Sequence, residues 1–336
     1  MPAGTATSSD NVVAVTGASA GIGRAAALAF ARRGWRVALI ARGLDALRAA
    51  EREVRDAGGE PLVVPADVAD PRQVDAAAER IEGEWGPIAV WVNNAMATVF
   101  SPFEAMTPEE FRRSTEVTYL GAVWGTQAAL KRMQPRNRGT IVQVGSALAY
   151  RSIPLQSAYC GAKSALRGFT DSLRSELIHD RSAVHLTMVH LSAFNTPQFD
   201  WGRNRMGRLA KPLGKIFQPE LAAEAIYWAS QQRRREVWVG WPAVQAILGT
   251  RIIPALLDRY LALRAYDGQL AEEPLPAGYA DNLLSPVPGE HGARGRFSAN
   301  ALPFSLQFWL NRHRWMLGAA AVAAMMLAGI VLALAR

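Results

Sequence analysis

A tyrosine and a lysine near the middle of the chain have the residue types and spacing of an acid–base pair. Tyr159 and Lys163 stand four positions apart, so in a helix both side chains lie on one face. A tyrosine with the ordinary pKa of ~10 exchanges protons poorly at neutral pH, and a neighbouring ammonium group lowers that pKa. Ser146 precedes the pair and offers a hydroxyl that can hold a substrate oxygen. A tyrosine and a lysine at this spacing are also common on the solvated face of a helix. The assignment therefore depends on the other motifs in the chain.

A glycine-rich turn near the N-terminus is the second chemical signal. Residues 16–23, TGASAGIG, lie between an apolar run typical of a buried strand and an alanine-rich helical stretch. Small residues at such a turn let the backbone approach a pyrophosphate, and the helix N-terminus directs free N–H groups at the phosphates. The turn would also suit a tight strand-to-helix connection without a ligand. Its position directly after the first strand favours dinucleotide binding.

With four later motifs, this turn resembles the short-chain dehydrogenase/reductase family over about residues 10–240. The spacing Gly-x-x-x-Gly-x-Gly is that of the family and differs from the general Gly-x-Gly-x-x-Gly form. The Tyr-x-x-x-Lys motif follows Ser146 by thirteen residues, as it does in the family. The other motifs are Asp67-Val68 after the third expected strand, NNAM at residues 93–96 after the fourth, and Thr196 after the sixth.

The resemblance implies hydride transfer between a nicotinamide and a carbonyl or alcohol carbon, with the hard chemistry performed by the cofactor. Tyr159 would exchange the proton, Lys163 would lower the tyrosine pKa and bond the nicotinamide ribose, and Ser146 would hold the substrate oxygen. The cofactor site implied by the family pattern comprises Gly17, Ser19, Ala20, Gly21, Ile22, Gly23, Asp67, Val68, Asn94, Ala95, Tyr159, Lys163 and Thr196.

Three positions depart from the family pattern. Met96 replaces a glycine and crowds the turn beside the cofactor. Thr118 stands where the family has a catalytic asparagine that supports a proton relay, and a hydroxyl lacks the paired donor and acceptor of an amide. Thr118 is therefore a candidate catalytic residue whose part in a relay is open. After the sixth strand, the sequence LSA at residues 191–193 replaces Pro-Gly.

The choice between NAD and NADP depends on the residue that ends the second strand. An acidic residue there would bond the ribose 2′-hydroxyl and select NAD. The sequence has Arg42 and no carboxylate, and a guanidinium can make a bidentate contact to a 2′-phosphate. An arginine at this position implies NADP(H) in the family. The alternative is a solvated arginine at a strand end.

The elements that must position these residues follow from the alternation of β-branched runs with alanine-rich stretches. This pattern predicts an α/β fold: a Rossmann-type doubly wound parallel sheet of about seven strands with helices on both faces. The expected strands are residues 11–16, 36–41, 61–65, 88–93, 140–145, 184–191 and 236–240, and the expected helices are residues 24–33, 44–57, 71–84, 109–132, 157–179 and 219–231. Residues 1–240 would form this catalytic domain, and residues 241–300 a helical extension, interrupted by Pro254, with an irregular linker.

Residues 301–336 are expected to form a membrane anchor. Residues 315–335 carry no charge, and a helix of this length spans roughly the 30 Å of a bilayer core. The alternative is a buried or oligomerisation helix. Arg312 and Arg314 precede the run, with Arg336 alone after it, so the positive-inside rule places the catalytic domain in the cytoplasm with a single C-terminal pass.

Composition narrows the remaining partners. The net charge of +8 is scattered along amphipathic helices without a recognition motif, which favours membrane lipid over nucleic acid. The single cysteine, Cys160, excludes an intramolecular disulfide and argues against a cysteine-rich metal site; no metal ligands and no secretory signal peptide are expected. The sequence predicts a membrane-anchored, NADPH-dependent oxidoreductase acting on a lipophilic small molecule. The alternatives are a catalytically weak NADP(H) sensor or scaffold, and a tyrosine-dependent isomerase or dehydratase. Homo-oligomerisation is left open.

Overall fold

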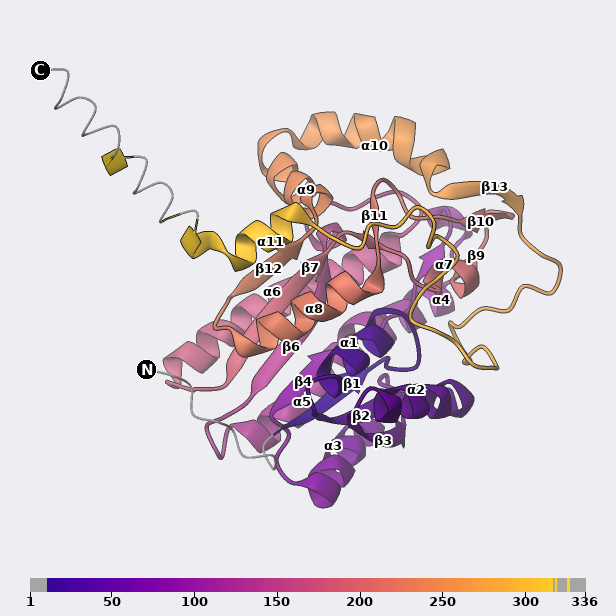
Figure 1. Cartoon of the computed structure of the whole chain (residues 1–336). Coiled ribbons are helices and arrows are strands. Elements are labelled where there is room, and N and C mark those ends of the chain that lie inside the picture. Colours follow the sequence, from indigo (N-terminus) through magenta and orange to yellow (C-terminus); the bar gives the residue numbers. More distant parts are fainter. Residues whose placement is uncertain (1–10, 317, 319–324, 327–336) are drawn as a thin grey trace, which may run out of the picture.

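A seven-stranded parallel sheet forms the centre of the computed structural model, which describes residues 11–316, 318, 325 and 326 (Figure 1). Its strand order is β12-β7-β6-β4-β1-β2-β3. The strands are β1 (Val12–Thr16), β2 (Arg36–Ala41), β3 (Glu60–Pro65), β4 (Val90–Asn93), β6 (Thr140–Ser146), β7 (His185–Leu191) and β12 (Glu236–Val239). The order reverses between β1 and β4, where a doubly wound sheet leaves a crevice at the carboxyl ends of its strands. The predicted Rossmann-type sheet is confirmed.

Helices cover both faces of the sheet because its strands are apolar on both sides. Val13 and Val15 enter one core cluster, and Val12 and Ala14 enter the other. The first cluster packs against α1 (Gly21–Ala31), α2 (Leu44–Asp56) and α8 (Pro219–Gln231). The second packs against α3 (Pro71–Trp85), α5 (Gly121–Met133) and α6 (Ser157–His179), with α4 (Pro108–Thr115) beside α6.

The expected long helix 109–132 is interrupted. A π-helical turn at Glu116–Leu120 separates α4 from α5, and such turns occur frequently at functional sites. The helix expected at residues 24–33 begins three residues earlier, at Gly21, because the second half of the glycine-rich turn is itself helical.

The carboxyl ends of the strands are covered by short elements and by the C-terminal extension (Figure 1). Three small two-stranded pairings, β5–β9, β8–β11 and β10–β13, surround this edge. Their strands are β5 (Val99–Phe100), β8 (Ala193–Phe194), β9 (Arg203–Asn204), β10 (Arg208–Ala210), β11 (Ile216–Phe217) and β13 (Leu270–Pro274). The remaining helices are α7 (Gln198–Trp201), α9 (Trp241–Ile252), α10 (Pro254–Gly268) and α11 (Leu306–Arg312), with short 3-10 turns at Phe103–Ala105 and Ala147–Ala149. Pro254 separates α9 from α10, as its position predicts.

Two expectations for the C-terminal third need correction. Residues 272–300 are irregular beyond β13, but they pack across the domain and do not form a free linker. The proposed anchor segment, 301–336, begins inside the folded unit. Phe308 of α11 is buried against Trp228, and the Gln307 side chain bonds the backbone of Gly240 and Trp238.

The apolar run 315–335 lies for the most part outside the described residues. Among the residues that are described, no helix has the length and hydropathy needed to cross a bilayer.

Candidate active site

The glycine-rich turn forms the floor of a cavity at the carboxyl ends of β1 and β2. Gly17 adopts a φ of +67°, which favours glycine, and a Cβ atom on Gly23 would lie 2.1 Å from the carbonyl oxygen of Gly17. Gly23 therefore sits behind the turn and lets α1 begin close to it. The predicted cofactor residues that line this nucleotide cavity are Gly17, Ser19, Ala20, Gly21, Ile22, Arg42, Asp67, Val68, Asn94, Ala95 and Thr196.

Hydrogen bonds fix the turn against the end of β4. The Thr16 hydroxyl accepts from the backbone N–H groups of Asn94, at 2.9 Å, and Ala95, at 3.1 Å. The Asn94 side chain donates in return to the carbonyl oxygen of Thr16, at 2.9 Å. The NNAM motif thus fixes the shape of the crevice at the switch point of the sheet.

A second cavity, of about 250 Å³, holds the predicted catalytic residues. Ser146 ends β6, and Tyr159 and Lys163 lie in the first two turns of α6. The residues that line both this catalytic cavity and the nucleotide cavity are Ile22, Asn94, Met96, Thr196 and Gln198. Met96, one of the departures from the family pattern, therefore stands at the junction of the two cavities, where a nicotinamide would meet a substrate.

Ser146, Tyr159 and Lys163 are brought together in the arrangement that the sequence predicts. Tyr159 is hydrogen-bonded to Ser146, whose hydroxyl also accepts from the N–H group of Leu148 at 3.1 Å. The Lys163 Nζ atom lies 5.7 Å from the centre of the Tyr159 ring and donates to the carbonyl oxygen of Val144 at 2.7 Å. Burial lowers the pKa of Lys163 to about 8.

The expected lowering of the Tyr159 pKa by Lys163 is wrong for the protein alone. Burial raises the pKa of Tyr159 well above its usual value, and this effect outweighs the hydrogen bond from Ser146. The phenol therefore keeps its proton at neutral pH. A neutral phenol is a proton donor, which suits the reduction of a carbonyl group.

Thr118 is committed to the backbone and does not serve as a relay hydroxyl. Its Oγ1 atom donates to the carbonyl oxygen of Ala97 and accepts from the N–H group of Ala97, both at 2.9 Å. The side chain is buried in the π-helical turn. Thr118 thus attaches this turn to the segment after β4 and is a positioning residue.

The third departure from the family pattern builds a connection to the C-terminal extension. The Ser192 hydroxyl donates to the carbonyl oxygen of Val239, at 2.8 Å, and accepts from the N–H group of Ala243 in α9, at 3.1 Å. A serine at this position therefore attaches the start of α9 to the end of β7.

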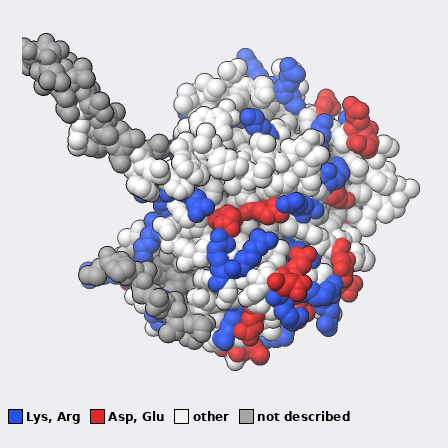
Figure 2. Space-filling view, viewed as in Figure 1, with Lys and Arg blue, Asp and Glu red and all other residues white. Residues whose placement is uncertain are grey.

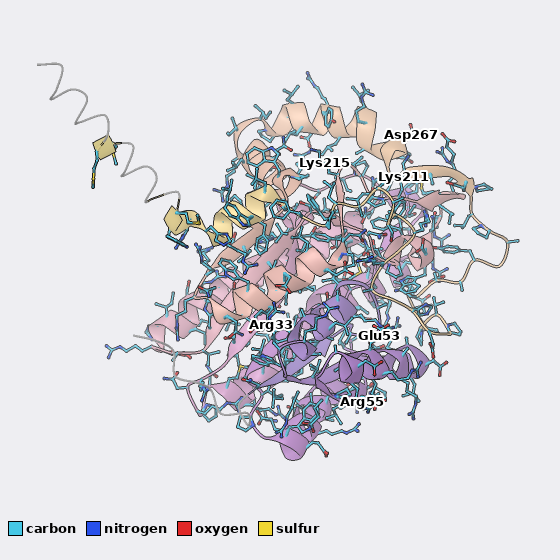
Figure 3. All side chains as sticks on the ribbon, in the orientation of Figure 1. Arg33, Glu53, Arg55, Lys211, Lys215 and Asp267 are labelled. Carbon is cyan, nitrogen blue, oxygen red and sulfur yellow. The ribbon has the colours of Figure 1, made fainter. Side chains whose placement is uncertain are left out.

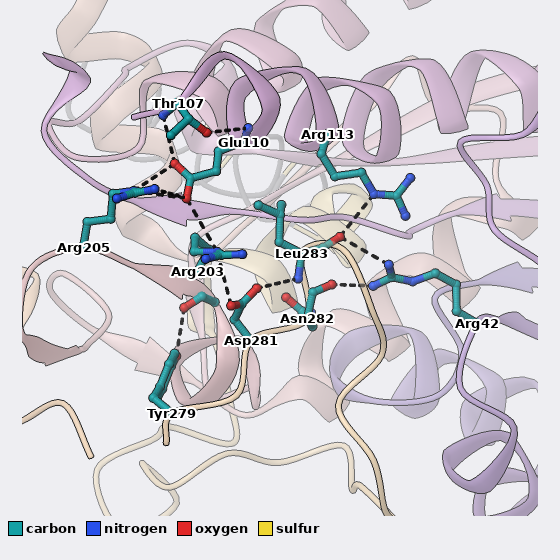
Figure 4. Close-up of polar contacts among 11 residues, drawn as sticks. Arg42, Thr107, Glu110, Arg113, Arg203, Arg205, Tyr279, Asp281, Asn282 and Leu283 are labelled. Carbon is teal, nitrogen blue, oxygen red and sulfur yellow. Dashed lines mark hydrogen bonds and ion pairs between the residues drawn. The ribbon is translucent and has the colours of Figure 1, made fainter. Parts of the chain in front are cut away.

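Arg42 lines the nucleotide cavity as predicted, but its guanidinium also holds a distant part of the chain (Figure 4). It donates to the carbonyl oxygens of Leu283, at 3.2 Å, and Leu284, at 2.9 Å, and to that of Asn282. Arg113 donates to the same Leu283 oxygen at 3.1 Å and pairs with Asp67. Burial, with a contribution from Arg113, lowers the pKa of Arg42. Two guanidinium groups thus converge on the Leu283 carbonyl oxygen, and Arg42 also lines the end of the cavity expected to take the adenosine.

The segment that they hold, residues 279–297, is named the strap. Asn282, Pro286, Val287 and His291 of the strap line the nucleotide cavity. The carbonyl oxygen of Gly292 accepts from the N–H group of Gly21 at the start of α1, at 3.1 Å. The strap residues were missed by the sequence analysis, because backbone carbonyls carry no residue signature. The only signal was the richness of this stretch in proline and glycine.

Polar contacts, shown in Figure 4, and one aromatic contact fasten the strap to the loop that contains α7 and β9. Asp281 pairs with Arg203 at 3.2 Å, and the Tyr279 hydroxyl donates to the carbonyl oxygen of Gly202 at 2.8 Å. The ring of His291 meets that of Trp201 with centroids 4.5 Å apart. The strap therefore contacts both the nucleotide cavity and the loop beside the catalytic cavity.

A buried carboxylate anchors the other side of this loop. Glu110 of α4 pairs with Arg205 at 2.9 Å and accepts the N–H group of Thr107 in a capping box. Although burial opposes it, the Arg205 guanidinium holds the pKa of Glu110 below its ordinary value. The ion pair thus stays formed at neutral pH and fixes the loop to α4.

Comparisons with known proteins agree with this geometry. The family model described as short chain dehydrogenase matches residues 11–204. An uncharacterized oxidoreductase of Bacillus subtilis, YxnA, is 33% identical over 267 residues, which cover 79% of this chain and 75% of the relative. An alcohol dehydrogenase from the archaeon Thermococcus sibiricus, complexed with 5-hydroxy-NADP, superposes with a TM-score of 0.59 at 27% identity, covering 68% of this chain and 95% of that one. A metagenomic short-chain oxidoreductase in complex with NADP gives a TM-score of 0.58 at 28% identity over 69% of this chain and 98% of that one.

Proposed function

Because the chain belongs to the short-chain dehydrogenase family, we propose that it is an NADPH-dependent carbonyl reductase, or in reverse an alcohol dehydrogenase, for a hydrophobic small molecule at a membrane. The observation that carries the proposal is the meeting of Ser146, Tyr159 and Lys163 in a cavity that shares its lining with the nucleotide cavity.

The residues of the nucleotide cavity fit a dinucleotide. The turn at Gly17 has no side chain that would keep a pyrophosphate from the backbone, and α1 presents its N-terminus there. When bound, NADPH supplies the hydride. Ser146 holds the carbonyl oxygen, Tyr159 donates its phenolic proton to that oxygen, and the Lys163 ammonium stabilises the phenolate that remains. The product alcohol thus gains one hydride and one proton.

Preference for NADPH is proposed from the two guanidinium groups, Arg42 and Arg113, at the adenosine end. Guanidinium groups bind phosphate in bidentate fashion, and no carboxylate ends β2 to receive a ribose hydroxyl. The two solved structures described above are complexes with 5-hydroxy-NADP and NADP, which supports this assignment.

A hydrophobic substrate is proposed from the lining of the catalytic cavity. Beyond Ser146, Tyr159 and Lys163, the lining is largely apolar, and its large apolar side chains include Leu148, Ile153, Phe194, Phe199, Leu213 and Leu261. Such a lining favours ligands that bury apolar surface. Placement at a membrane is proposed from the uncharged sequence 315–335.

The deciding experiment is a turnover assay with NADPH and NADH against a panel of aliphatic and aromatic ketones. We expect oxidation of NADPH with apolar ketones, with little turnover in Tyr159→Phe. If NADPH binds but neither the parent nor Tyr159→Phe turns over any carbonyl compound, the sensor or scaffold function is favoured instead. Product formed without net cofactor oxidation would favour an isomerase.

A further inference from the structure

Helix α10 lies over the catalytic cavity with almost no packing on its outer side. Of its residues, only Ala265 is buried. Leu256, Tyr260 and Leu263 follow one another at helical spacing and are 61%, 57% and 81% exposed. A fifteen-residue helix with large apolar side chains on its solvent side leaves that side without a partner within the described residues.

Helix α9 and the turn to α10 carry further exposed apolar side chains. Trp241, Leu248 and Ile252 of α9 are 58%, 43% and 77% exposed, and Ile253 at the turn is 45% exposed. We call the exposed apolar side chains of residues 241–266 the outer face.

The outer face is interspersed with positive charge. Three exposed arginines belong to the same two helices: Arg251, Arg259 and Arg264. Asp258 is paired with Arg151 of the catalytic cavity, which leaves Asp267 as the other acidic residue of the pair of helices. In the space-filling view, blue groups lie among white ones over α10, and red gathers toward the end where β13 follows (Figure 2).

The inner sides of the same two helices form part of the catalytic cavity. Pro242 and Ala246 of α9 and Leu261 of α10 line it. At one end, the Arg151–Asp258 pair holds α10; at the other, the buried Gln269 bonds Gln156 just before α6 and the carbonyl oxygen of Pro154. The helix is thus fastened at both ends above the cavity, while its middle has apolar side chains on both sides.

We propose that the outer face lies on the surface of an anionic lipid bilayer and that substrate passes from the lipid into the catalytic cavity beside α10. This inference rests on the proposed function for its substrate. Apolar side chains with tryptophan, tyrosine and arginine among them match the boundary between acyl chains and anionic headgroups.

The position of α11 favours a bilayer over a second copy of the chain as the partner. Gln307 of α11 bonds the N–H group of Gly240, so α11 lies against the start of α9. The exposed Trp315 follows α11 and begins the uncharged sequence 315–335. The start of α9, where the outer face begins, and α11, which precedes the apolar sequence, therefore lie close together. A second copy that met the outer face through its own outer face would have to place acidic groups opposite the three arginines. The two helices contain only Asp258, which is already paired, and Asp267.

A depth measurement on the full chain tests the location. Leu263→Cys is labelled with an environment-sensitive fluorophore, since the single natural cysteine, Cys160, is buried. Arg55→Cys, on α2 at the far side of the molecule from α10, is the matched control (Figure 3). Vesicles contain phosphatidylcholine and phosphatidylglycerol in equal amounts, with or without a lipid-borne quencher.

We expect a blue shift and quenching at position 263 and neither at position 55. An unquenched label at position 263 on vesicle-bound protein would overturn the proposal. So would a blue shift that appears without vesicles and grows with protein concentration, because it would identify a second copy as the partner.

A rate measurement tests the route of the substrate. Leu263→Glu should lower turnover of a ketone dissolved in the vesicles about fivefold or more, because it removes a good part of the free energy of burying a leucine. Turnover of a water-soluble ketone should stay at the parent level. Ile178→Glu, at an apolar position at the end of α6 that is 70% exposed, should change neither rate.

Equal turnover of the vesicle ketone by the parent and Leu263→Glu would overturn the route. If the parent reduces neither ketone, the proposed function fails, and the depth measurement still decides whether the outer face binds lipid.

Discussion

Replacing Arg42 with alanine should raise the KM for NADPH at least tenfold and change the KM for NADH far less. The guanidinium lines the nucleotide cavity beside Arg113, at the end where β2 stops. A charge-assisted hydrogen bond contributes about 1.5–3 kcal/mol, which corresponds to a factor of roughly 10 to 150 in binding. The 2′-phosphate is the only part of the nucleotide that distinguishes the two cofactors, so the ratio of the two KM values isolates its contact.

The structure adds a second role that the assay must separate from the first. Arg42 also holds three carbonyl groups of the strap, and the loss of these bonds would weaken binding of both cofactors alike. Arg42→Lys serves as the matched variant. Its ammonium group keeps the charge, but it cannot bond three carbonyl oxygens at once as the planar guanidinium group does. We expect Arg42→Lys to keep most of the preference for NADPH while raising both KM values.

Steady-state rates at fixed ketone and varied cofactor give the KM for NADPH and the KM for NADH of the parent, Arg42→Ala and Arg42→Lys. A better KM for NADH in the unmodified enzyme would refute the assignment of Arg42 to the phosphate. An equal rise for both cofactors in Arg42→Ala would show that the guanidinium acts on the strap alone.

Four further outcomes follow from contacts within the site. Tyr159→Phe should lower kcat at least ~10²-fold while cofactor affinity, measured by fluorescence titration, stays within a few-fold; a variant with near-parent turnover would point to another acid. The reductase kcat should fall as pH rises through about 8, because burial lowers the pKa of Lys163 to that value and its ammonium is lost above it; a rate that stays flat to a higher pH would contradict this role. Thr118→Val should reduce the free energy of unfolding by about 1–3 kcal/mol in urea titrations, since both hydrogen bonds to Ala97 disappear, and an unchanged midpoint would show that they contribute nothing. Truncation after Arg314 should leave the fold and the activity on a water-soluble ketone intact and should make membrane binding reversible by high salt, because only the outer face then contacts lipid. Deletion of all residues from 301 onward should unfold part of the core because Phe308 is buried. Full-length protein in the soluble fraction after alkaline extraction would contradict the anchor.

The parts of the fold and site that could be predicted are those with a local signature. Alternating strand and helix patterns gave the seven-stranded sheet, and the spacing between Ser146 and Tyr159 placed both at one edge of it. The direction of the Tyr159 pKa shift could not be predicted in the same way. It depends on how deeply the ring is buried, which is a property of the packed cavity.

The π-helical turn at Thr118, which interrupts the expected helix, and the course of the strap could not be predicted from the sequence for a different reason. A threonine at a family asparagine position suggests a weaker relay, but its hydroxyl binds the backbone of Ala97, twenty-one residues away. The strap is held by carbonyl groups, which every residue possesses. Only the three-dimensional path of the chain shows which of them meet Arg42.

The strap also has a consequence for the order in which the protein is made. Arg42 and Leu283 are 241 residues apart, so a ribosome completes β1, β2 and the glycine-rich turn long before the wall opposite them exists. A contact between residues so far apart cannot form until the strap itself has emerged from the ribosome, and its loop-closure entropy makes it slow to form. Until then, the residues of the glycine-rich turn lack the wall that the strap supplies to the nucleotide cavity. A dinucleotide present at that stage would meet an open crevice, and the strap would close over it as the last part of the chain emerges.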